Sequence, residues 1–173
     1  MRFLRLNLEA PLSAFGGVAV DGLGVTRAHP ALSAITGLLA NALGYDRTET
    51  GRLAALQARL LLASAFRAGD GRRLTDFQTA QLAKNDKGWT RWGVEGRDGG
   101  AKTYDSPALT YRDYHADRQT ICVVGLKGDG DPDLDALAAA LDRPERPLFI
   151  GRKSCLPSRP IRGGMIEAGD ALE

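Results

Sequence analysis

The side chains best suited to chemistry near neutral pH are the two histidines, because a histidine changes its charge in that range. His115 follows Tyr114 directly and stands four residues after Tyr111, and a histidine beside a tyrosine can serve as general base in a metal-independent ribonuclease. A single histidine next to a strand is more often structural or simply exposed. His29 precedes Pro30 at an expected helix start, so a two-histidine site would require both residues to converge. The sequence therefore keeps an endoribonuclease as an alternative function.

Basic side chains concentrate near the C-terminal end, although the whole chain has a net charge of only +2. Residues 1–142 hold 17 basic and 17 acidic side chains, whereas residues 143–162 hold six basic and one acidic. A glycine-led basic turn at residues 151–154 offers backbone amides and two cations, which suit a phosphate. It lacks the GxxxxGK(S/T) frame, which argues against a nucleotide hydrolase. A solvated basic loop is the alternative interpretation. The candidate anion-binding residues of this segment are Arg152, Lys153 and Arg159.

Residues 69–106 have no sustained hydrophobic period and are rich in Gly, Lys, Arg and Asp. So long a polar excursion is uncommon inside a compact domain unless it forms a binding arm or a hairpin. Tryptophans and cations are interleaved here, which suits single-stranded nucleic acid, because bases stack on the rings while cations track the phosphates. Tryptophans that pack on the domain or on a protein partner fit the pattern equally well. The candidates in this arm are Lys84, Lys87, Trp89, Arg91 and Trp92.

Composition places the chain among ordinary globular proteins. Its 43% hydrophobic and 25% charged residues argue against disordered and disulfide-dense classes. Cys122 and Cys155 have no spacing suited to zinc or to a disulfide framework, so we expect no metal and no cofactor. Apolar runs such as residues 60–63 are far shorter than the ~20 residues that cross a bilayer. The chain opens without a basic and then apolar leader, so we expect a cytoplasmic protein.

Hydrophobic periodicity predicts the secondary structure. Alternating leucines predict a strand over residues 4–9, and an apolar stripe predicts a helix over residues 30–44. Gly37 inside that helix costs roughly 1 kcal/mol against alanine, so we expect a close packing partner there. The other predicted elements are a helix over 51–58, strands over 60–66, 108–114, 120–126 and 148–150, and a helix that starts at 131–133 and ends before Pro144.

The order strand, helix, strand, arm, strand, helix, strand predicts an α+β, ferredoxin-like (RRM-like, βαββαβ) fold, with an antiparallel sheet under two helices. We expect one domain over residues 1–173, with a thumb-like insertion at about 70–107 and a basic C-terminal segment at 151–162. The same topology underlies RNA-recognition modules, but a fold alone assigns no function.

Five segments form an ordered set of motifs. They are residues 10–16 after the first strand, the helix at 30–44, Asp-Phe-Gln-Thr-Ala at 76–80, Arg-x-Tyr-x-x-Asp at 112–117 and Gly-Arg-Lys-Ser-Cys at 151–155. In this order the set resembles CRISPR-associated protein family five, the CasD-type RAMP subunit of type I-E Cascade surveillance complexes. The resemblance spans nearly the whole chain.

The resemblance implies a non-catalytic, crRNA-binding scaffold with a ferredoxin-like domain and an extended thumb. Such subunits cap the 5′ handle of the guide RNA in antiviral defence. They contact the Cascade backbone subunit and the large PAM-recognising subunit, near the target DNA. Relatives in type I-C systems also cleave the repeat RNA, which corresponds to the endoribonuclease alternative. The RNA-binding candidates are then Ser33 at the helix start, Gln78 for handle bases, and the basic and aromatic residues Arg152, Lys153, Arg159, Lys84, Lys87, Trp89, Arg91 and Trp92.

Overall fold

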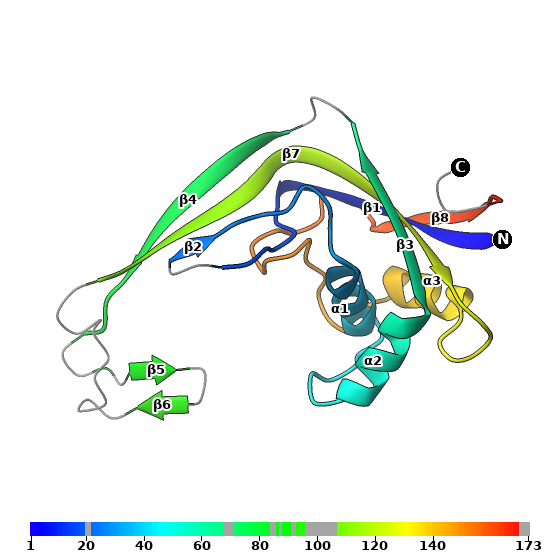
Figure 1. The fold of residues 1–173 in the computed structure, drawn as a ribbon, viewed down its shortest axis with the longest axis horizontal. Helices are drawn as coiled ribbons and strands as arrows, with labels where there is room; N and C mark the ends of the chain where they lie inside the picture. Colours follow the sequence, from blue (N-terminus) through cyan, green and yellow to red (C-terminus); the bar gives the residue numbers. More distant parts are fainter. Residues whose placement is uncertain are drawn as a thin grey trace.

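The computed structural model describes residues 1–19, 22–67, 71–83, 86, 88–90, 93–95 and 107–169. These residues form eight β-strands and three α-helices (Figure 1). The strands are β1 (Arg2–Ser13), β2 (Leu23–Gly24), β3 (Leu60–Phe66), β4 (Arg72–Ala80), β5 (Gly88–Thr90), β6 (Gly93–Glu95), β7 (Ala108–Leu126) and β8 (Arg162–Glu167). The helices are α1 (Leu32–Ala42), α2 (Thr50–Arg59) and α3 (Leu134–Asp142). No helix in the described part of the chain is long and apolar enough to cross a membrane.

β7 is the central strand of a six-stranded sheet. β1 and β2 pair with β7 in the order β2-β7-β1-β8, and β3 and β4 also pair with β7. The pairs β1–β7, β3–β7, β4–β7 and β1–β8 are antiparallel, whereas the short β2 runs parallel to β7. β5 and β6 form a separate two-stranded sheet. The chain therefore combines one main, largely antiparallel sheet with helices, and the predicted α+β class is confirmed at this level.

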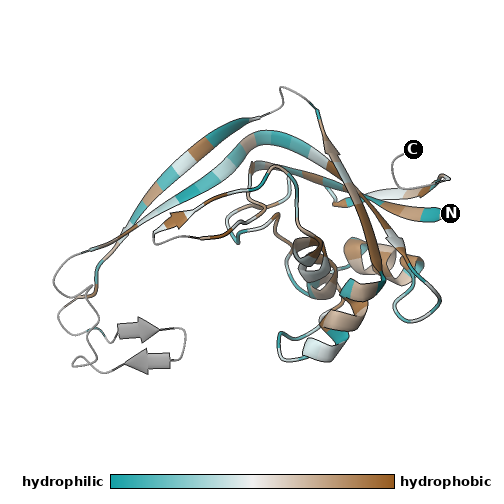
Figure 2. Cartoon of the chain, in the orientation of Figure 1, coloured by the Kyte–Doolittle hydropathy of each residue, from teal (hydrophilic) through white to brown (hydrophobic). Residues whose placement is uncertain are grey.

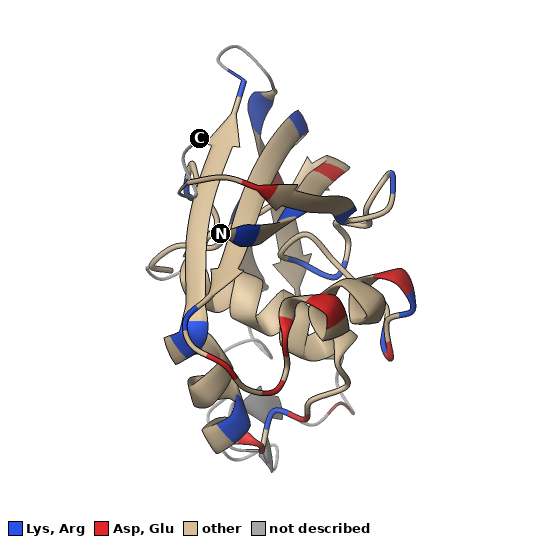
Figure 3. Ribbon diagram, turned by 90° about the vertical axis from the view of Figure 1, so that its right-hand side faces the viewer, with Lys and Arg blue, Asp and Glu red and all other residues tan. Residues whose placement is uncertain are grey.

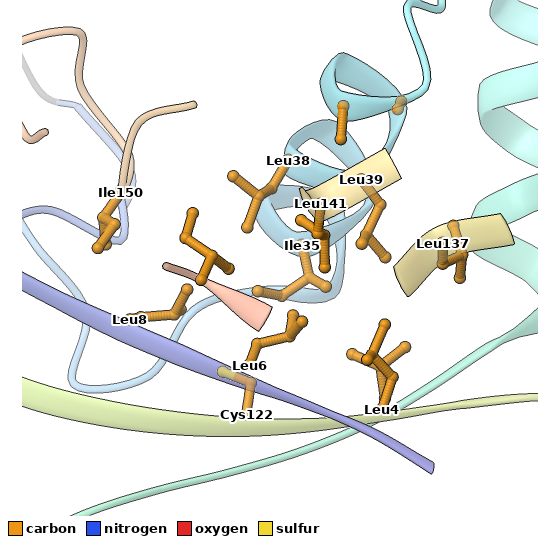
Figure 4. Close-up of a cluster of buried hydrophobic side chains, with 14 of the residues drawn as sticks. Leu4, Leu6, Leu8, Ile35, Leu38, Leu39, Cys122, Leu137, Leu141 and Ile150 are labelled. Carbon is orange, nitrogen blue, oxygen red and sulfur yellow. The ribbon is translucent and has the colours of Figure 1, made fainter. Parts of the chain in front are cut away.

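The hydrophobic core lies between this sheet and the helices, which lie on one side of it in Figure 1. Leu4, Leu6 and Leu8 alternate along β1 and are all buried, which confirms the predicted strand over residues 4–9. Each such leucine contributes roughly 1.5–3 kcal/mol of hydrophobic stabilisation relative to an exposed one. Figure 4 shows the side chains that meet them, which are Ile35, Leu38 and Leu39 from α1, Cys122 from β7, Leu137 and Leu141 from α3, and Ile150.

The predicted helix ends agree with the structure. Asp133 caps α3, since its Oδ1 accepts a hydrogen bond from the amide of Ala136 at 2.7 Å. Gly44 follows α1 in the left-handed region, at φ +79°, where glycine is the favoured residue. The stop at Gly44 was predicted, and a helix start was predicted within residues 131–133. The helix begins only after Asp133, so Pro132 precedes the N-cap and does not lie in the first turn.

β3 and β4 lie end to end along the same edge of β7. Phe66 of β3 pairs with Thr120, and Arg72 of β4 pairs with Ala116. Between these two positions Asp117 adopts a left-handed φ of 52°. From there β4 and residues 108–116 of β7 extend beyond the helices and form what we call the arm (Figure 1). Figure 2 shows mainly hydrophilic ribbon in the arm, interrupted by hydrophobic segments.

A buried carboxylate joins the two strands of the arm. Asp113 of β7 is 3% exposed, and its carboxylate accepts hydrogen bonds from the Arg73 guanidinium and, at 2.7 Å, from the Thr75 hydroxyl of β4. The bond from Arg73, followed by that from Thr75, holds the pKa of Asp113 below its usual value. Asp113 is therefore ionised at neutral pH and links the strands through charge-assisted bonds.

The predicted strand over residues 148–150 is wrong, and the last strand is β8 at Arg162–Glu167. Residues 150–155 form a tight turn instead, in which the amide of Ile150 donates to the carbonyl of Cys155 and the amide of Cys155 donates to the carbonyl of Arg152. Ile150 is apolar because it packs in the core. β8 contains Gly163 and Gly164, and paired glycines weaken the sequence signal of a strand.

We expect Asp113→Asn to destabilise the protein at pH 7 by about 1–3 kcal/mol, because the variant loses charge-assisted bonds within the arm. Arg73 is 59% exposed, so water screens part of this interaction. The folded-state pKa of Asp113 is lowered, so its contribution is present above the ordinary aspartate pKa and is lost as the pH falls through the folded-state value. Urea unfolding at pH 7 and at pH 3 checks this: the difference between wild type and variant should shrink at pH 3. An equal difference at both values would contradict it.

Candidate functional site

A cleft of about 710 Å³ separates α1 from the segment 146–153. Its walls are Ser33, Gly37 and Asn41 of α1 on one side and Arg146, Gly151 and Lys153 on the other. Phe15, which is 5% exposed, lines the cleft where β1 ends. Residues distant in sequence therefore form one concave surface.

A second hollow of about 430 Å³ continues from this cleft. The two share five lining residues, which are Ala14, Phe15, Ser33, Ala34 and Gly151. We call the two together the basic groove. Its described lining contains five cations, which are Arg27, Arg47, Arg146, Arg152 and Lys153, and one acid, Asp46. An open groove with this balance of charge suits an extended anion.

Gly151 sets the position of the basic turn against β1. The amide of Ala14 donates to the carbonyl of Ile150 at 3.1 Å, and a Cβ on Gly151 would collide with the carbonyl oxygen of Ala14. Gly151 also has a φ of +98°, which side-chain-bearing residues rarely adopt. A glycine is therefore required here, and it brings Arg152 and Lys153 to the edge of the groove.

The first turn of α1 faces the groove with its positive end uncovered. Ala31 at the N-cap makes no side-chain cap bond, and the first turn contains no acidic residue. Ser33 is exposed and lines the groove, as expected for a residue at the helix start. Gly37 is exposed as well, and a Cβ added there would meet no atom within 4 Å. The packing partner expected for Gly37 is therefore not found among the described residues.

Arg152 is held by the protein itself. Its Nη1 donates to the carbonyl of Asp113 and its Nη2 to the carbonyl of Gly24, each at 3.0 Å. Its guanidinium carbon lies 4.6 Å from the centre of the Tyr114 ring. Arg152 thus joins the basic turn to β2 and β7, whereas the adjacent Lys153 is exposed on the groove. The RNA contacts expected of Arg152 and Lys153 stay predictions.

The other arginines of the C-terminal basic segment lie elsewhere. Arg159 forms an ion pair with Glu9 at 3.2 Å, and Arg162 forms one with Asp142 at 2.9 Å. Figure 3 shows basic and acidic residues interspersed over the side that it presents. The basic segment of the sequence is therefore divided in space, and only Arg146, Arg152 and Lys153 of its six cations line the groove.

His115 uses both ring nitrogens within the protein. Its Nε2 donates to the carbonyl of Arg27 at 2.8 Å, and Nη1 of Arg118 lies 3.2 Å from both ring nitrogens, of which Nδ1 is the acceptor. Burial lowers the pKa of His115, and the positive charge of Arg118 lowers it further. The ring is therefore neutral at pH 7, and its basic nitrogen is covered by an arginine.

Arg118 fixes the chain segment that leads into α1. It is 5% exposed, its Nη2 donates to the carbonyl of Ala28 at 2.5 Å, and its guanidinium carbon lies 3.4 Å from the centre of the Phe66 ring. Together with His115 it holds residues 27 and 28 at the groove. Burial lowers the pKa of Arg118, but an arginine stays charged at every physiological pH.

The three residues of the nuclease hypothesis do not share one surface. Tyr111 is 45% exposed and pairs with Phe77, whereas Tyr114 is buried and pairs with Leu74. Because residues three apart on a strand point to opposite faces, the two tyrosines lie on different faces of the arm. His115 bonds to neither of them among the contacts of the described residues.

The thumb candidates cannot be placed. Lys84, Lys87, Arg91 and Trp92 lie outside the described residues, and so does the side chain of Trp89. Gln78 is described: it is exposed on β4, opposite Thr110, and is not among the residues that line the basic groove.

Sequence reasoning did not single out Arg27, Arg47 or Arg146. Arg27 precedes α1 and Arg47 follows it, so each flanks an end of the predicted helix. Cations at both ends of a helix whose first turn lacks acids are a sequence signal that would have indicated an anion site at α1. The sequence does not show that residues 146–153 lie opposite α1 and form the second wall of the groove.

The fold and the groove define a class: a small α+β protein that presents a cationic groove, shaped for an extended anion, between a helix and a glycine-anchored turn. A family model narrows this class. The chain belongs to the family of CRISPR-associated proteins described as CRISPR-associated protein (Cas_Cas5), because the Cas_Cas5d model matches residues 3–173.

Similar proteins include the CRISPR system Cascade subunit CasD of Escherichia coli (strain K12), which is 27% identical over 175 residues, 97% of this chain and 73% of that protein. A chain in a solved CRISPR RNA-guided surveillance complex has a TM-score of 0.70 and 25% identity, over 92% of this chain and 61% of that one. The crystal structure of a Cas protein has a TM-score of 0.58 and 28% identity, over 98% of this chain and 68% of that one. This chain thus spans about three fifths to three quarters of these relatives.

The two glycines of the groove predict opposite responses to alanine. Gly151→Ala should destabilise the protein by about 1–3 kcal/mol, since its Cβ would collide with Ala14 at a strained φ. Gly37→Ala should stabilise it by up to about 1 kcal/mol, since the site is helical and open. Thermal unfolding of both variants checks this. Shifts of the melting temperature in the same direction would contradict the assignment.

Proposed function

We propose that this protein is a non-catalytic, RNA-binding subunit of a CRISPR Cascade surveillance complex. The observation that carries the proposal is the basic groove, in which five cations and one acid line a continuous hollow. Membership of the family and similarity to a Cascade subunit and to a chain of an RNA-guided complex support the same function.

The groove matches the backbone of single-stranded RNA. Exposed Arg27, Arg47 and Lys153 supply charges for successive phosphates, and the uncovered first turn of α1 supplies amides and the Ser33 hydroxyl. Asp46 is the one lining acid, and hydrogen bonds from Thr48 lower its pKa and keep it ionised at the far end of α1. Asp46 is therefore the one charge of the described groove lining that opposes a phosphate, and the adjacent Arg47 offsets it.

The ligand is the 5′ handle of the crRNA, and the protein caps this end of the guide-RNA assembly in antiviral defence. The open side of the groove leaves the RNA accessible to neighbouring subunits, which are the Cascade backbone subunit and the large PAM-recognising subunit. In this arrangement Arg152 positions the turn while Lys153 contacts phosphate.

The fold of this subunit is ferredoxin-like. Counting β3 and β4 as one continuous edge, the main sheet has the order β8-β1-β7-β3, with antiparallel neighbours. α1 and α2 follow β1, and α3 follows β7. This order supports a βαββαβ topology in one domain whose second and third strands are lengthened into an arm.

Removing two groove cations should weaken RNA binding. The variant Arg47→Ala with Lys153→Ala should bind a handle-containing single-stranded crRNA roughly 25-fold more weakly near 0.1 M salt, and its salt slope should fall by about 1.4. The matched control, Arg67→Ala with Arg143→Ala, removes the same charge from exposed arginines outside the groove. Fluorescence anisotropy over a salt series measures both quantities. Equal losses in the two double variants would show that only net charge matters.

The endoribonuclease alternative has a direct test. We expect incubation of the protein with its repeat RNA in EDTA to give a complex but no cleavage, because the Nδ1 of His115 is covered by Arg118. Denaturing and native gels separate these outcomes. Cleavage that disappears in His115→Ala would establish the nuclease. His115→Gln is the structural control, because its amide nitrogen occupies the place of Nε2 and can still donate to the carbonyl of Arg27.

A further inference from the structure

His115 has no part in the proposed RNA contacts, yet its ring makes a specific bond to a distant loop. The Nε2 atom donates to the main-chain carbonyl of Arg27 at 2.8 Å, and 88 residues separate the two in sequence. The centre of the His115 ring also lies 5.7 Å from that of Phe15, which lines the groove. The histidine therefore lies where β7, the turn after β1 and the loop before α1 meet.

The loop before α1 depends on hydrogen bonds for its shape. Residues 25–31 form neither helix nor strand. The amide of Arg27 donates to the carbonyl of Gly16 at 2.9 Å. One residue earlier, the hydroxyl of Thr26 accepts from the amide of Phe15 at 2.9 Å. Because an ordered backbone loses conformational entropy, a segment without regular structure needs such bonds to keep one conformation.

β7 supplies bonds to the other side of this loop. Arg118 donates to the carbonyl of Ala28, and His115 donates to the carbonyl of Arg27 itself. Together with the amide bond to Gly16, the bond from His115 fixes both main-chain polar groups of Arg27. His115 is only partly buried and is not part of the hydrophobic core cluster, so its replacement leaves that core in place.

The side chain of Arg27 is available to a ligand. It is exposed, and it lines the smaller hollow of the basic groove with Ser33 and Arg152. It forms none of the ion pairs found among the described residues. An arginine on a fixed main chain loses less conformational freedom on binding than the same side chain on a loose loop. The bond from His115 therefore acts on the affinity of the groove for a phosphate.

The state of the His115 ring suits a hydrogen-bond donor. Burial lowers the pKa of His115, and Nη1 of Arg118 lies 3.2 Å from both ring nitrogens, so the ring is neutral at pH 7. The carbonyl of Arg27 can only accept, which assigns the proton of the neutral ring to Nε2. The ring holds the loop in this state, and no proton has to move.

We propose that His115 is a positioning residue for RNA binding: its Nε2 hydrogen bond holds the main chain of Arg27 so that the guanidinium meets a phosphate in the smaller hollow. This inference rests on the proposed function and adds to it the residue through which β7 acts on the groove.

The test is a double-mutant cycle between His115 and Arg27. His115→Phe removes the donor and keeps an aromatic ring, and Arg27→Ala removes the charge. Each should weaken the binding of the single-stranded crRNA about fivefold near 0.1 M salt and lower the salt slope by about 0.7, the value for one lost phosphate contact. Because His115 acts through Arg27, both changes together should weaken binding about fivefold and not about 25-fold. Fluorescence anisotropy over a salt series measures all four proteins.

Two controls separate positioning from folding and from net charge. His115→Gln places an amide donor at the position of Nε2 and should restore the wild-type affinity. Arg67→Ala removes one exposed arginine outside the groove and should leave the salt slope unchanged. Thermal unfolding verifies that each variant is folded, and His115→Leu takes the place of His115→Phe in the cycle if the phenyl ring prevents folding.

The outcomes distinguish this inference from the proposed function. If His115→Phe binds like the wild type, or weakens binding equally with and without Arg27→Ala, His115 does not act through Arg27 and the inference is overturned. If Arg47→Ala with Lys153→Ala loses binding while Arg27→Ala does not, the inference is wrong and the RNA-binding function stands. If the wild type does not bind crRNA even at low salt, both are wrong.

Discussion

The structure depends on the length of one strand, β7, whose 19 residues pair with four other strands. The commonest strand length is about five or six residues. The second half of β7 is anchored in the core, where Cys122 and Val124 are fully buried, and burial raises the pKa of Cys122 to about 12. The first half continues into the arm. Because the two halves are one strand, the position of the arm relative to the core is fixed. The hydrogen bond from Arg152 to the Asp113 carbonyl in turn fixes the basic turn against the arm.

The arginines of this protein divide into two kinds. Arg118 and Arg152 donate to main-chain carbonyls and lie over aromatic rings, so they hold the protein together. Neither has an ion pair with a carboxylate within the described part of the chain. A buried guanidinium is costly unless its donors are bonded, and here carbonyls bond them without cancelling the charge. Arg118 therefore leaves positive charge beneath the loop that borders the groove, and this charge adds to that of the exposed Arg27 and Lys153.

Local elements were largely predictable from the sequence, and their long-range arrangement was not. The alternating leucines of β1, the stripe of α1 and the stop Gly44 all act over a few residues, and each is confirmed. The start of α3 was predicted within residues 131–133, and the structure assigns its cap to Asp133. β8 was missed because its partner is β1, some 160 residues away, and two glycines hide its pattern. Charge along the chain identified Lys153, but the groove also needs Arg27 and Arg47, which stand alone in the sequence and are brought together only by packing.

A nearly neutral protein can hold a polyanion if its acids are neutralised away from the binding surface. Four exposed ion pairs do this here: Arg2 with Asp135, Arg52 with Glu49, Arg159 with Glu9 and Arg162 with Asp142. None of these eight side chains lines the basic groove. Exposed ion pairs contribute roughly 0–1 kcal/mol each, so their stabilising effect is small. Their larger effect is on the electrostatic field of the protein. The two charges of each pair cancel each other at short range, whereas the groove cations act together on a ligand within a Debye length of ~8–10 Å. The net charge of +2 is therefore a sum over two surfaces with different tasks.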